Sequence, residues 1–146
     1  MAIEIRRLIF SHNEAIEAIK VYGTKNNITF PDGKIVRAKF AGPAESEINT
    51  FKQIKSEIRS HYNVKEDRRA VILTIFSEKT LEQKYFNLSA GFISIALIEY
   101  CIDHKIILPK DAEKTLDLTE FNICLDISRD SFTEDDTSAT RLSLID

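Results

Sequence analysis

The chain has 146 residues, of which 43% are hydrophobic and 29% are charged, and its formal net charge is −3. That length is sufficient for one domain with a buried core, and the composition is that of a globular protein. The acidic balance argues against a protein built mainly to coat nucleic acid.

The charge is distributed unevenly along the chain. Residues 1–69 contain 13 Lys+Arg and 9 Asp+Glu and so carry a net charge of +4, whereas residues 70–146 contain 7 and 14 and carry −7. We therefore expect the C-terminal half to suit a basic partner.

The sequence indicates neither secretion nor membrane insertion. Charged residues from Glu4 to Arg7 lie where the apolar core of a signal peptide would begin. The longest apolar runs, such as Ile95–Ile98, are much shorter than the roughly 20 residues of a membrane-spanning helix. Cys101 and Cys124 are expected to be reduced thiols. These features predict a cytoplasmic protein that does not contact a membrane.

The first strand is predicted at 3–10 and leads directly into a helix. Either Ser11 or Asn13 can cap that helix, and Gly23 lies near its predicted end. The buried face of the helix is expected to consist of Ala15, Ile16, Ala18, Ile19 and Tyr22.

A turn is predicted at Pro31-Asp32-Gly33, because proline presets φ, aspartate bonds back to the backbone and glycine accepts a positive φ. The next strand is predicted at 35–40. Its alternation predicts one face made of Val36, Ala38 and Phe40, and an opposite face made of Arg37 and Lys39.

Three further elements follow in the middle of the chain. The segment 45–62 is predicted to be a helix with a narrow apolar face and a charged surface. The nearly continuous apolar run 70–76 is typical of a central strand that is buried on both faces. Only a short turn separates it from the strand predicted at 82–88, so these two strands should form an antiparallel hairpin.

The segment 89–104 is predicted to be a helix around which the rest of the chain is organised. A helix that is apolar on nearly every side must be covered on more than one side. We expect a sheet to cover one side, and a second helix or a partner subunit to cover another. Only Ser94, Glu99 and Asp103 are expected to face water. The apolar positions are Phe92, Ile93, Ile95, Ala96, Leu97, Ile98, Tyr100, Cys101 and Ile102.

The last strand is predicted at 116–127, where apolar and polar residues alternate. This alternation predicts one buried face, which includes Phe121 and Ile123, and one face in contact with water. Residues 128–146 are polar and acidic and are expected to form a flexible tail. The predicted domain therefore spans 1–127.

The chain matches itself at an offset of 78 residues. The aligned pairs are Phe10-Ser11 with Leu88-Ser89, Ala18-Ile19 with Ala96-Leu97, Tyr22 with Tyr100, and 28–31 with 106–109. Two interpretations stay open, a true internal repeat or two strand–helix units with similar capping requirements. A true repeat predicts two pseudo-symmetric βαβ halves, a variant of the split βαβ or ferredoxin-like plan.

Together these elements predict a single α+β domain. Its sheet is expected to be mixed or antiparallel, with about five strands and with three helices mainly on one face. The expected strands are 3–10, 35–40, 70–76, 82–88 and 116–127, and the expected helices begin near residues 11, 45 and 89.

The sequence predicts no catalytic residue, no cofactor and no metal. Cys101 and His104 share a helix face and could supply half of a zinc site, but a buried thiol and a helix-end imidazole are the simpler interpretation. Apolar or acidic neighbours of Cys101 and Cys124 should raise the pKa of both thiols, which disfavours a nucleophile. The helix start at Ser89–Gly91 offers amides to an anion, although an ordinary cap is favoured.

The strongest surface signal is a basic stretch between residues 52 and 69. On a helix, Lys52, Lys55 and Arg59 would share one edge and could follow a phosphate backbone. The alternative is a solvated helix face. The candidate binding residues are Lys52, Lys55, Arg59, Arg68 and Arg69.

The predicted function is that of a non-enzymatic protein-binding module, such as a small regulatory, adaptor or inhibitor-neutralising protein. It would act through a helix face or through its acidic C-terminal half. The partner is expected to be a protein, and a homodimer formed through a helix face is a further possibility. Two alternatives stay open, namely nucleic-acid or nucleotide binding by 52–69 and an enzyme with an unrecognised site.

Overall fold

The structure, a computed structural model, describes residues 3–41, 62, 64 and 67–130. Within these ranges the chain forms two helices and six strands, and the prediction of an α+β domain is confirmed. In chain order the elements are β1 Ile3–Ser11, α1 His12–Lys25, β2 Lys34–Phe40, β3 Ala70–Ser77, β4 Glu82–Ser89, α3 Ala90–Asp103, β5 Glu113–Leu118 and β6 Asn122–Asp130. The helix predicted at 45–62 lies outside the described residues, apart from Tyr62.

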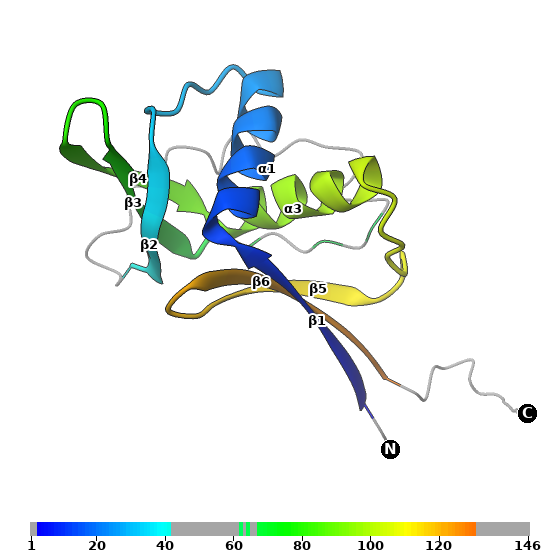
Figure 1. Ribbon diagram of the computed structural model, residues 1–146. Helices are drawn as coiled ribbons and strands as arrows, with labels where there is room; N and C mark the ends of the chain where they lie inside the picture. The colour runs from blue at the N-terminus through cyan, green and yellow to red at the C-terminus, as the bar shows by residue number, and fades with distance from the viewer. Residues whose placement is uncertain (1–2, 42–61, 63, 65–66, 131–146) are drawn as a thin grey trace, which may run out of the picture.

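The strands form two separate antiparallel sheets, so the prediction of one sheet of about five strands is wrong. Sheet A has the order β1-β6-β5, and sheet B has the order β2-β3-β4. In Figure 1, sheet A passes below the two helices, while sheet B lies at the end of α3 where that helix begins. The split βαβ plan fails for the same reason, because it requires a single sheet.

The predicted hairpin and central strand are confirmed in sheet B. β3 pairs with β4 in the antiparallel sense, with Ala70 opposite Ser89 and Ser77 opposite Glu82. β2 covers the other edge of β3, which makes β3 central. Six of its eight residues are buried, as its β-branched, apolar sequence predicts.

The helix α3 is the centre of the hydrophobic core. Ten of its fourteen residues are buried, including all those from Ala90 to Ile98. The core around it combines residues of α1 and of both sheets. Ser94, which was expected to face water, is buried, whereas Ile102, near the end of the helix, is exposed. The prediction of a helix covered on more than one side is therefore confirmed, and the cover comes from the same chain.

The helix α1 supplies the helical part of that cover and crosses α3 (Figure 1). The rings of Tyr22 and Phe92 pack with their centroids 4.9 Å apart. An ion pair of 3.0 Å joins Lys25 Nζ to Glu99 Oε2. A second helix was one of the two alternatives predicted to cover this side of α3, and a partner subunit was the other.

Both helices begin directly after a strand and are capped by serine. Ser11 Oγ accepts from the amide of Glu14 at 3.1 Å, and Glu14 Oε1 accepts from the Ser11 amide at 2.9 Å, which forms a capping box. Ser89 Oγ accepts from the Phe92 amide at 3.1 Å. Of the two predicted caps of α1, the structure therefore selects Ser11 rather than Asn13.

The strand predicted at 116–127 is in fact two strands, β5 and β6, joined by a tight turn. Thr119 and Asn122 close this turn, because the Thr119 amide donates to the Asn122 carbonyl at 3.0 Å and the Asn122 amide donates to Thr119 Oγ1 at 3.1 Å. Apolar residues still alternate on both sides of the turn, and the turn contains neither Gly nor Pro, so the pattern resembles one long strand. Phe121, predicted to be buried, is 70% exposed at the turn.

A buried lysine fixes the connection that precedes β5. The side chain of Lys114 is 5% exposed. Its Nζ donates to the carbonyl of Tyr62 at 2.7 Å, to that of Lys110 at 3.2 Å and to that of Pro109. Three carbonyl oxygens satisfy the three donors of an ammonium group, and the contact holds Tyr62 against sheet A.

The central position of α3 gives a stability prediction. Phe92→Ala should lower the free energy of unfolding by about 3–5 kcal/mol, because it removes a fully buried ring. Phe121→Ala is the matched control, and its effect should stay within about 0.5 kcal/mol because that ring is largely exposed. Urea unfolding followed by circular dichroism measures both. Equal losses in the two variants would contradict the assignment of α3 to the core.

Candidate functional site

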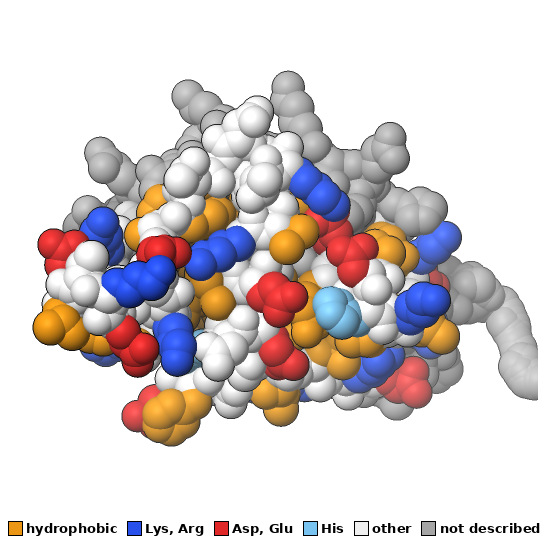
Figure 2. Space-filling view, turned by 45° about the horizontal axis from the view of Figure 1, so that its top comes forward, with side chains coloured by type: hydrophobic (Ala, Val, Ile, Leu, Met, Phe, Trp, Pro, Cys, Tyr) orange, Lys and Arg blue, Asp and Glu red, His pale blue; other side chains and the backbone are white. Residues whose placement is uncertain are grey.

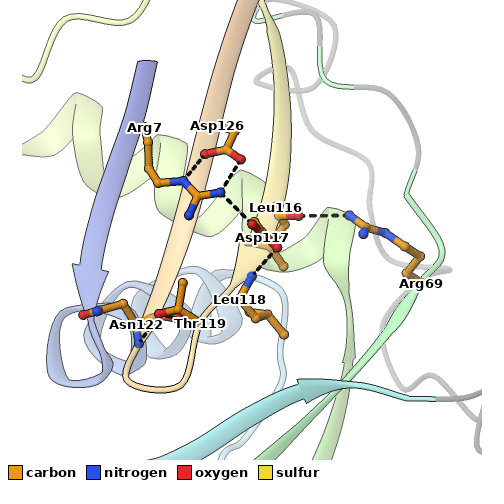
Figure 3. Close-up of polar contacts among 8 residues, drawn as sticks. All are labelled: Arg7, Arg69, Leu116, Asp117, Leu118, Thr119, Asn122 and Asp126. Carbon is orange, nitrogen blue, oxygen red and sulfur yellow. Dashed lines mark hydrogen bonds and ion pairs between the residues drawn. The ribbon is translucent and has the colours of Figure 1, made fainter. Parts of the chain in front are cut away.

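The candidate site is a groove between the two sheets, with a volume of about 610 Å³. One wall is β2, and the other is the turn between β5 and β6; Figure 3 shows that turn, with Leu118, beside the cyan strand β2. This volume lies within the range of roughly 300–1,000 Å³ that is common for ligand sites. The lining residues are Val36, Arg37, Ala38, Lys39, Phe40, Leu118, Thr119, Glu120 and Phe121.

A β-bulge shapes the wall formed by β2. Ile35 pairs with Ile75 and Arg37 pairs with Thr74, so that Val36 is an extra residue without its own partner. The bulge lets both Ile35 and Ala38 face the core, although they are three positions apart. Val36, predicted to share a face with Ala38, is instead 51% exposed, whereas Ala38 is buried. The two exposed residues Val36 and Arg37 are therefore adjacent in the groove wall.

The opposite wall is held in place by an ion cluster that crosses all three strands of sheet A. Arg7 on β1 binds Asp126 on β6 with two bonds, Nε to Oδ1 at 2.7 Å and Nη2 to Oδ2 at 2.8 Å. The same Nη2 binds Asp117 Oδ2 on β5 at 2.6 Å (Figure 3). Asp117 also accepts at 2.9 Å from the amide of Leu118, which is the first residue of the groove wall.

This cluster changes the proton affinity of Arg7 and of Asp117. The bond from Arg7 and the bond from the Leu118 amide lower the pKa of Asp117, because both stabilise the carboxylate. The bonds to Asp126 and Asp117 raise the pKa of Arg7. Arg7 and Asp117 are therefore both charged at neutral pH.

Arg69 joins the two walls of the groove. Its guanidinium binds the Asp67 carboxylate, with Nη2 to Oδ2 at 2.7 Å and Nε to Oδ1 at 3.0 Å. The same Nη2 donates to the Leu116 carbonyl on β5 at 3.1 Å (Figure 3). The guanidinium carbon also lies 4.3 Å from the ring centroid of Phe40 on β2. Such a stacked, bidentate arginine is well suited to fixing neighbouring segments.

The basic stretch predicted as a binding surface is only partly described. Lys52, Lys55 and Arg59 lie outside the described residues. Arg68 and Arg69 are both exposed, and the side chain of Arg69 contacts Asp67, Leu116 and Phe40. Arg69 therefore does not line the groove, and its guanidinium connects β5 to β2.

The charges along the groove are mixed, with an excess of cations. Exposed Arg37 and Lys39 project from β2, and Glu120 lies on the opposite wall. Exposed Lys34 precedes them on the same strand. On the face of the molecule shown in Figure 2, basic and acidic side chains are interspersed. Arg37 and Lys39 therefore give the β2 wall of the groove a positive charge.

The two cysteines show the features of buried core residues. Both are free and buried. Burial raises the pKa of the Cys101 thiol to about 11, and it also raises the pKa of Cys124. Neither thiol is therefore activated as a nucleophile, which agrees with the prediction from their neighbours.

Cys101 and His104 differ in exposure, although they lie three residues apart at the end of α3. Cys101 is buried, whereas His104 is exposed at the end of α3 and stacks on Tyr100, with ring centroids 4.0 Å apart. His104 Nδ1 lies 2.9 Å from the Tyr100 carbonyl oxygen. Among the residues that the structure describes, no group of three His, Cys, Asp or Glu side chains is placed to hold a metal ion.

The possible anion site at the start of α3 is also occupied by the chain itself. The Ala90 amide donates to the Arg69 carbonyl at 2.8 Å, and the Gly91 amide donates to the Asp67 carbonyl at 2.9 Å. The Phe92 amide donates to the cap, Ser89. The idea that these amides bind an anion is therefore wrong, and the ordinary cap is correct.

Comparisons of this chain with protein-family models, with curated proteins and with solved structures found no match. No helix among the described residues is both long enough and apolar enough to cross a membrane. The groove is therefore interpreted from its own geometry. Sequence reasoning missed it because the bulge at Val36 depends on pairing with β3, which is distant in sequence, and because the turn at Phe121 lacks Gly and Pro and preserves the apolar alternation.

The ion cluster of sheet A predicts a dependence of stability on pH. A carboxylate whose pKa is lowered by folding stabilises the protein above the unfolded value of about 3.9, and this contribution is lost as the pH falls through the folded value. Asp117→Asn should therefore lower the free energy of unfolding near pH 7, and the difference from the wild type should shrink near pH 3. Solvent screening keeps the effect modest, because Asp117 is partly exposed.

The measurement is urea unfolding at both pH values, with Asp111→Asn as the control. Asp111 is more exposed and makes a longer ion pair of 3.4 Å with Arg129. A difference between wild type and Asp117→Asn that stays constant from pH 7 to pH 3 would contradict the proposed role of the cluster.

Proposed function

We propose that the protein is a non-enzymatic protein-binding module and that the groove beside β2 is its binding surface. One observation carries the proposal, namely that the open edge of β2 borders a groove lined by both exposed apolar and exposed basic side chains. Val36 and Phe121, which are 51% and 70% exposed, supply the apolar contacts. Arg37 and Lys39 supply the charge.

The groove suits an extended segment of a partner, added as a further strand. Among the described residues, β3 is the only strand that pairs with β2, so the opposite edge of β2 presents backbone donors and acceptors. An extended peptide can bind such an edge through its backbone, while side-chain pockets determine which peptide is accepted. The turn at Leu118–Phe121 supplies the second side of the groove.

The charges of the groove favour an acidic segment that also carries apolar side chains. Arg37 and Lys39 outnumber Glu120 among the residues that line the groove. Complementary charge raises the rate of encounter and excludes wrong partners. The sequence suggests two other surfaces, a helix face and the acidic C-terminal half. α3 is buried within the chain, and the C-terminal half contributes only the wall at Leu118–Phe121.

We also propose that the 78-residue match reflects a true internal repeat. The helices α1 and α3 begin and end at positions 78 residues apart, and so do their serine caps. The amides of Ile28 and Ile106, which are 78 residues apart, donate at 2.8 Å to the carbonyls of Gly23 and Cys101, which are separated by the same offset.

We further propose that the protein is cytoplasmic, because its two described cysteines are free thiols.

A peptide titration tests the proposed function. The probe is a fluorescent ten-residue peptide of alternating Glu and Val, and the matched probe replaces each Glu by Lys. The acidic peptide should bind, and the double variant Arg37→Glu/Lys39→Glu should weaken its binding by about tenfold or more, because two attractive charges become repulsive. Fluorescence anisotropy measures both affinities.

Lys79→Glu/Lys84→Glu is the control, since both lysines are exposed on or beside the β3–β4 turn, outside the groove. This variant should bind the acidic peptide as the wild type does. Equal binding of the acidic and basic peptides, or an equal loss in both double variants, would contradict the proposal. Tight binding of single-stranded DNA with a steep salt dependence would instead favour the nucleic-acid alternative.

A further inference from the structure

The outer edge of sheet A is formed by β1, a strand with exposed apolar side chains and, among the described residues, a strand neighbour on one side only. β1 lies at one end of the order β1-β6-β5, so its only strand neighbour among the described residues is β6 (Figure 1). Ile5 and Ile9 are 71% and 61% exposed, although both belong to this nine-residue strand. Long edge strands with exposed apolar residues readily pair with another chain.

The backbone groups that β1 offers to a partner can be identified. The Asn122 carbonyl accepts from Thr119 on the β5 side, so Asn122 does not bond to Ser11, its opposite residue on β1. The Ser11 amide instead donates to Glu14. Because donors and acceptors alternate along a strand, Ile9, Arg7 and Ile5 direct both their N–H and C=O groups away from β6, toward the open edge.

The charge at the centre of this edge is already compensated. Arg7 lies between Ile5 and Ile9 on the same face of the strand. It makes three hydrogen bonds to the carboxylates of Asp126 and Asp117, within its own chain. Two copies of Arg7 can therefore approach each other with less repulsion than two unpaired guanidinium groups would have.

We propose that β1 pairs with β1 of a second copy of this chain, antiparallel and about a twofold axis at Arg7. In this register Ile5 lies opposite Ile9 of the second copy, and Ile9 lies opposite its Ile5. Each apolar side chain then gains an apolar cross-strand neighbour, and the outward backbone groups of all three residues are paired. The contact is isologous, so it closes as a dimer.

The neighbouring registers do not give this match. A shift by two residues would place the axis at Arg6, with Ile5 opposite Arg7, or at Leu8, with Ile9 opposite Arg7, so that the apolar pairs are lost in either direction. The side-chain pattern therefore selects one alignment among those that the backbone permits. The pairing joins two copies of sheet A into one continuous sheet.

This dimer is independent of the proposed peptide groove. The groove lies at β5 and β2, whereas β1 is at the opposite edge of sheet A. Both grooves stay open in the dimer, so that a divalent partner would gain avidity. A variant that abolishes the dimer should therefore still bind the peptide in the groove, so that dimerisation and peptide binding can be measured separately.

The mass of the protein in solution tests the proposal. Light scattering and sedimentation over an about hundredfold range of concentration should show a dimer for the wild type. Ile5→Lys/Ile9→Lys should be monomeric over the same range, because it replaces both apolar pairs by charges. Leu81→Lys, which changes a 76% exposed residue at the β3–β4 turn, should remain dimeric. A monomeric wild type, or a dimeric double variant, overturns the proposal.

Cysteine cross-linking tests the register while Arg7 is retained. Ile5→Cys/Ile9→Cys should form a disulfide-linked dimer under mild oxidation, because Cα atoms of directly opposite residues are about 5.5 Å apart. Ile5→Cys alone should not, because the two copies of residue 5 would be about 13 Å apart along the strands. Cross-linking of the single variant as efficient as that of the double variant, or no cross-linking of either, overturns the proposed alignment.

Discussion

The burial of α3 is the constraint on which the rest of the structure depends. A helix with apolar residues on nearly every side cannot be covered by one small sheet, because a sheet contacts only one side of a helix. The chain meets this requirement with α1 and with two separate sheets, whose inner residues join a single core. Of the two covers expected beside a sheet, a second helix or a partner subunit, the structure shows the second helix, α1, within the same chain.

Dividing the strands between two sheets creates the surface features from which function is inferred. Each three-stranded sheet has two edges, and the edge of β2 lies close to the turn that joins β5 and β6. The groove forms there because the sheets approach each other without pairing. Arg69 bridges this region through Asp67, Leu116 and Phe40, while Arg7 ties the three strands of sheet A together. Both arginines therefore hold the strands that form the groove walls, although neither side chain lines the groove.

Local patterns in the sequence predict the elements whose signals are local. Ser11, the run at 70–76 and the apolar helix at 89–104 each lead to the observed structure, because capping, β-branching and periodicity act over a few residues. The turn at 119–121 is hidden, since it lacks Gly and Pro and preserves the alternation on either side. The bulge at Val36 and the contacts of Arg69 depend on residues distant in sequence, so a single sequence does not reveal them. For the same reason the sequence does not predict the groove, which is lined by β2 and not by the basic stretch 52–69.

The most direct test of the central role of α3 is native-state hydrogen exchange of its backbone amides. If both sheets depend on this helix, its amides should exchange only through global unfolding, with the free energy that urea unfolding gives for the whole protein. Exchange of the α3 amides at a clearly lower free energy, while the amides of β3 and β6 stay protected, would show that the sheets persist without the helix. That result would contradict the dependence of both sheets on α3.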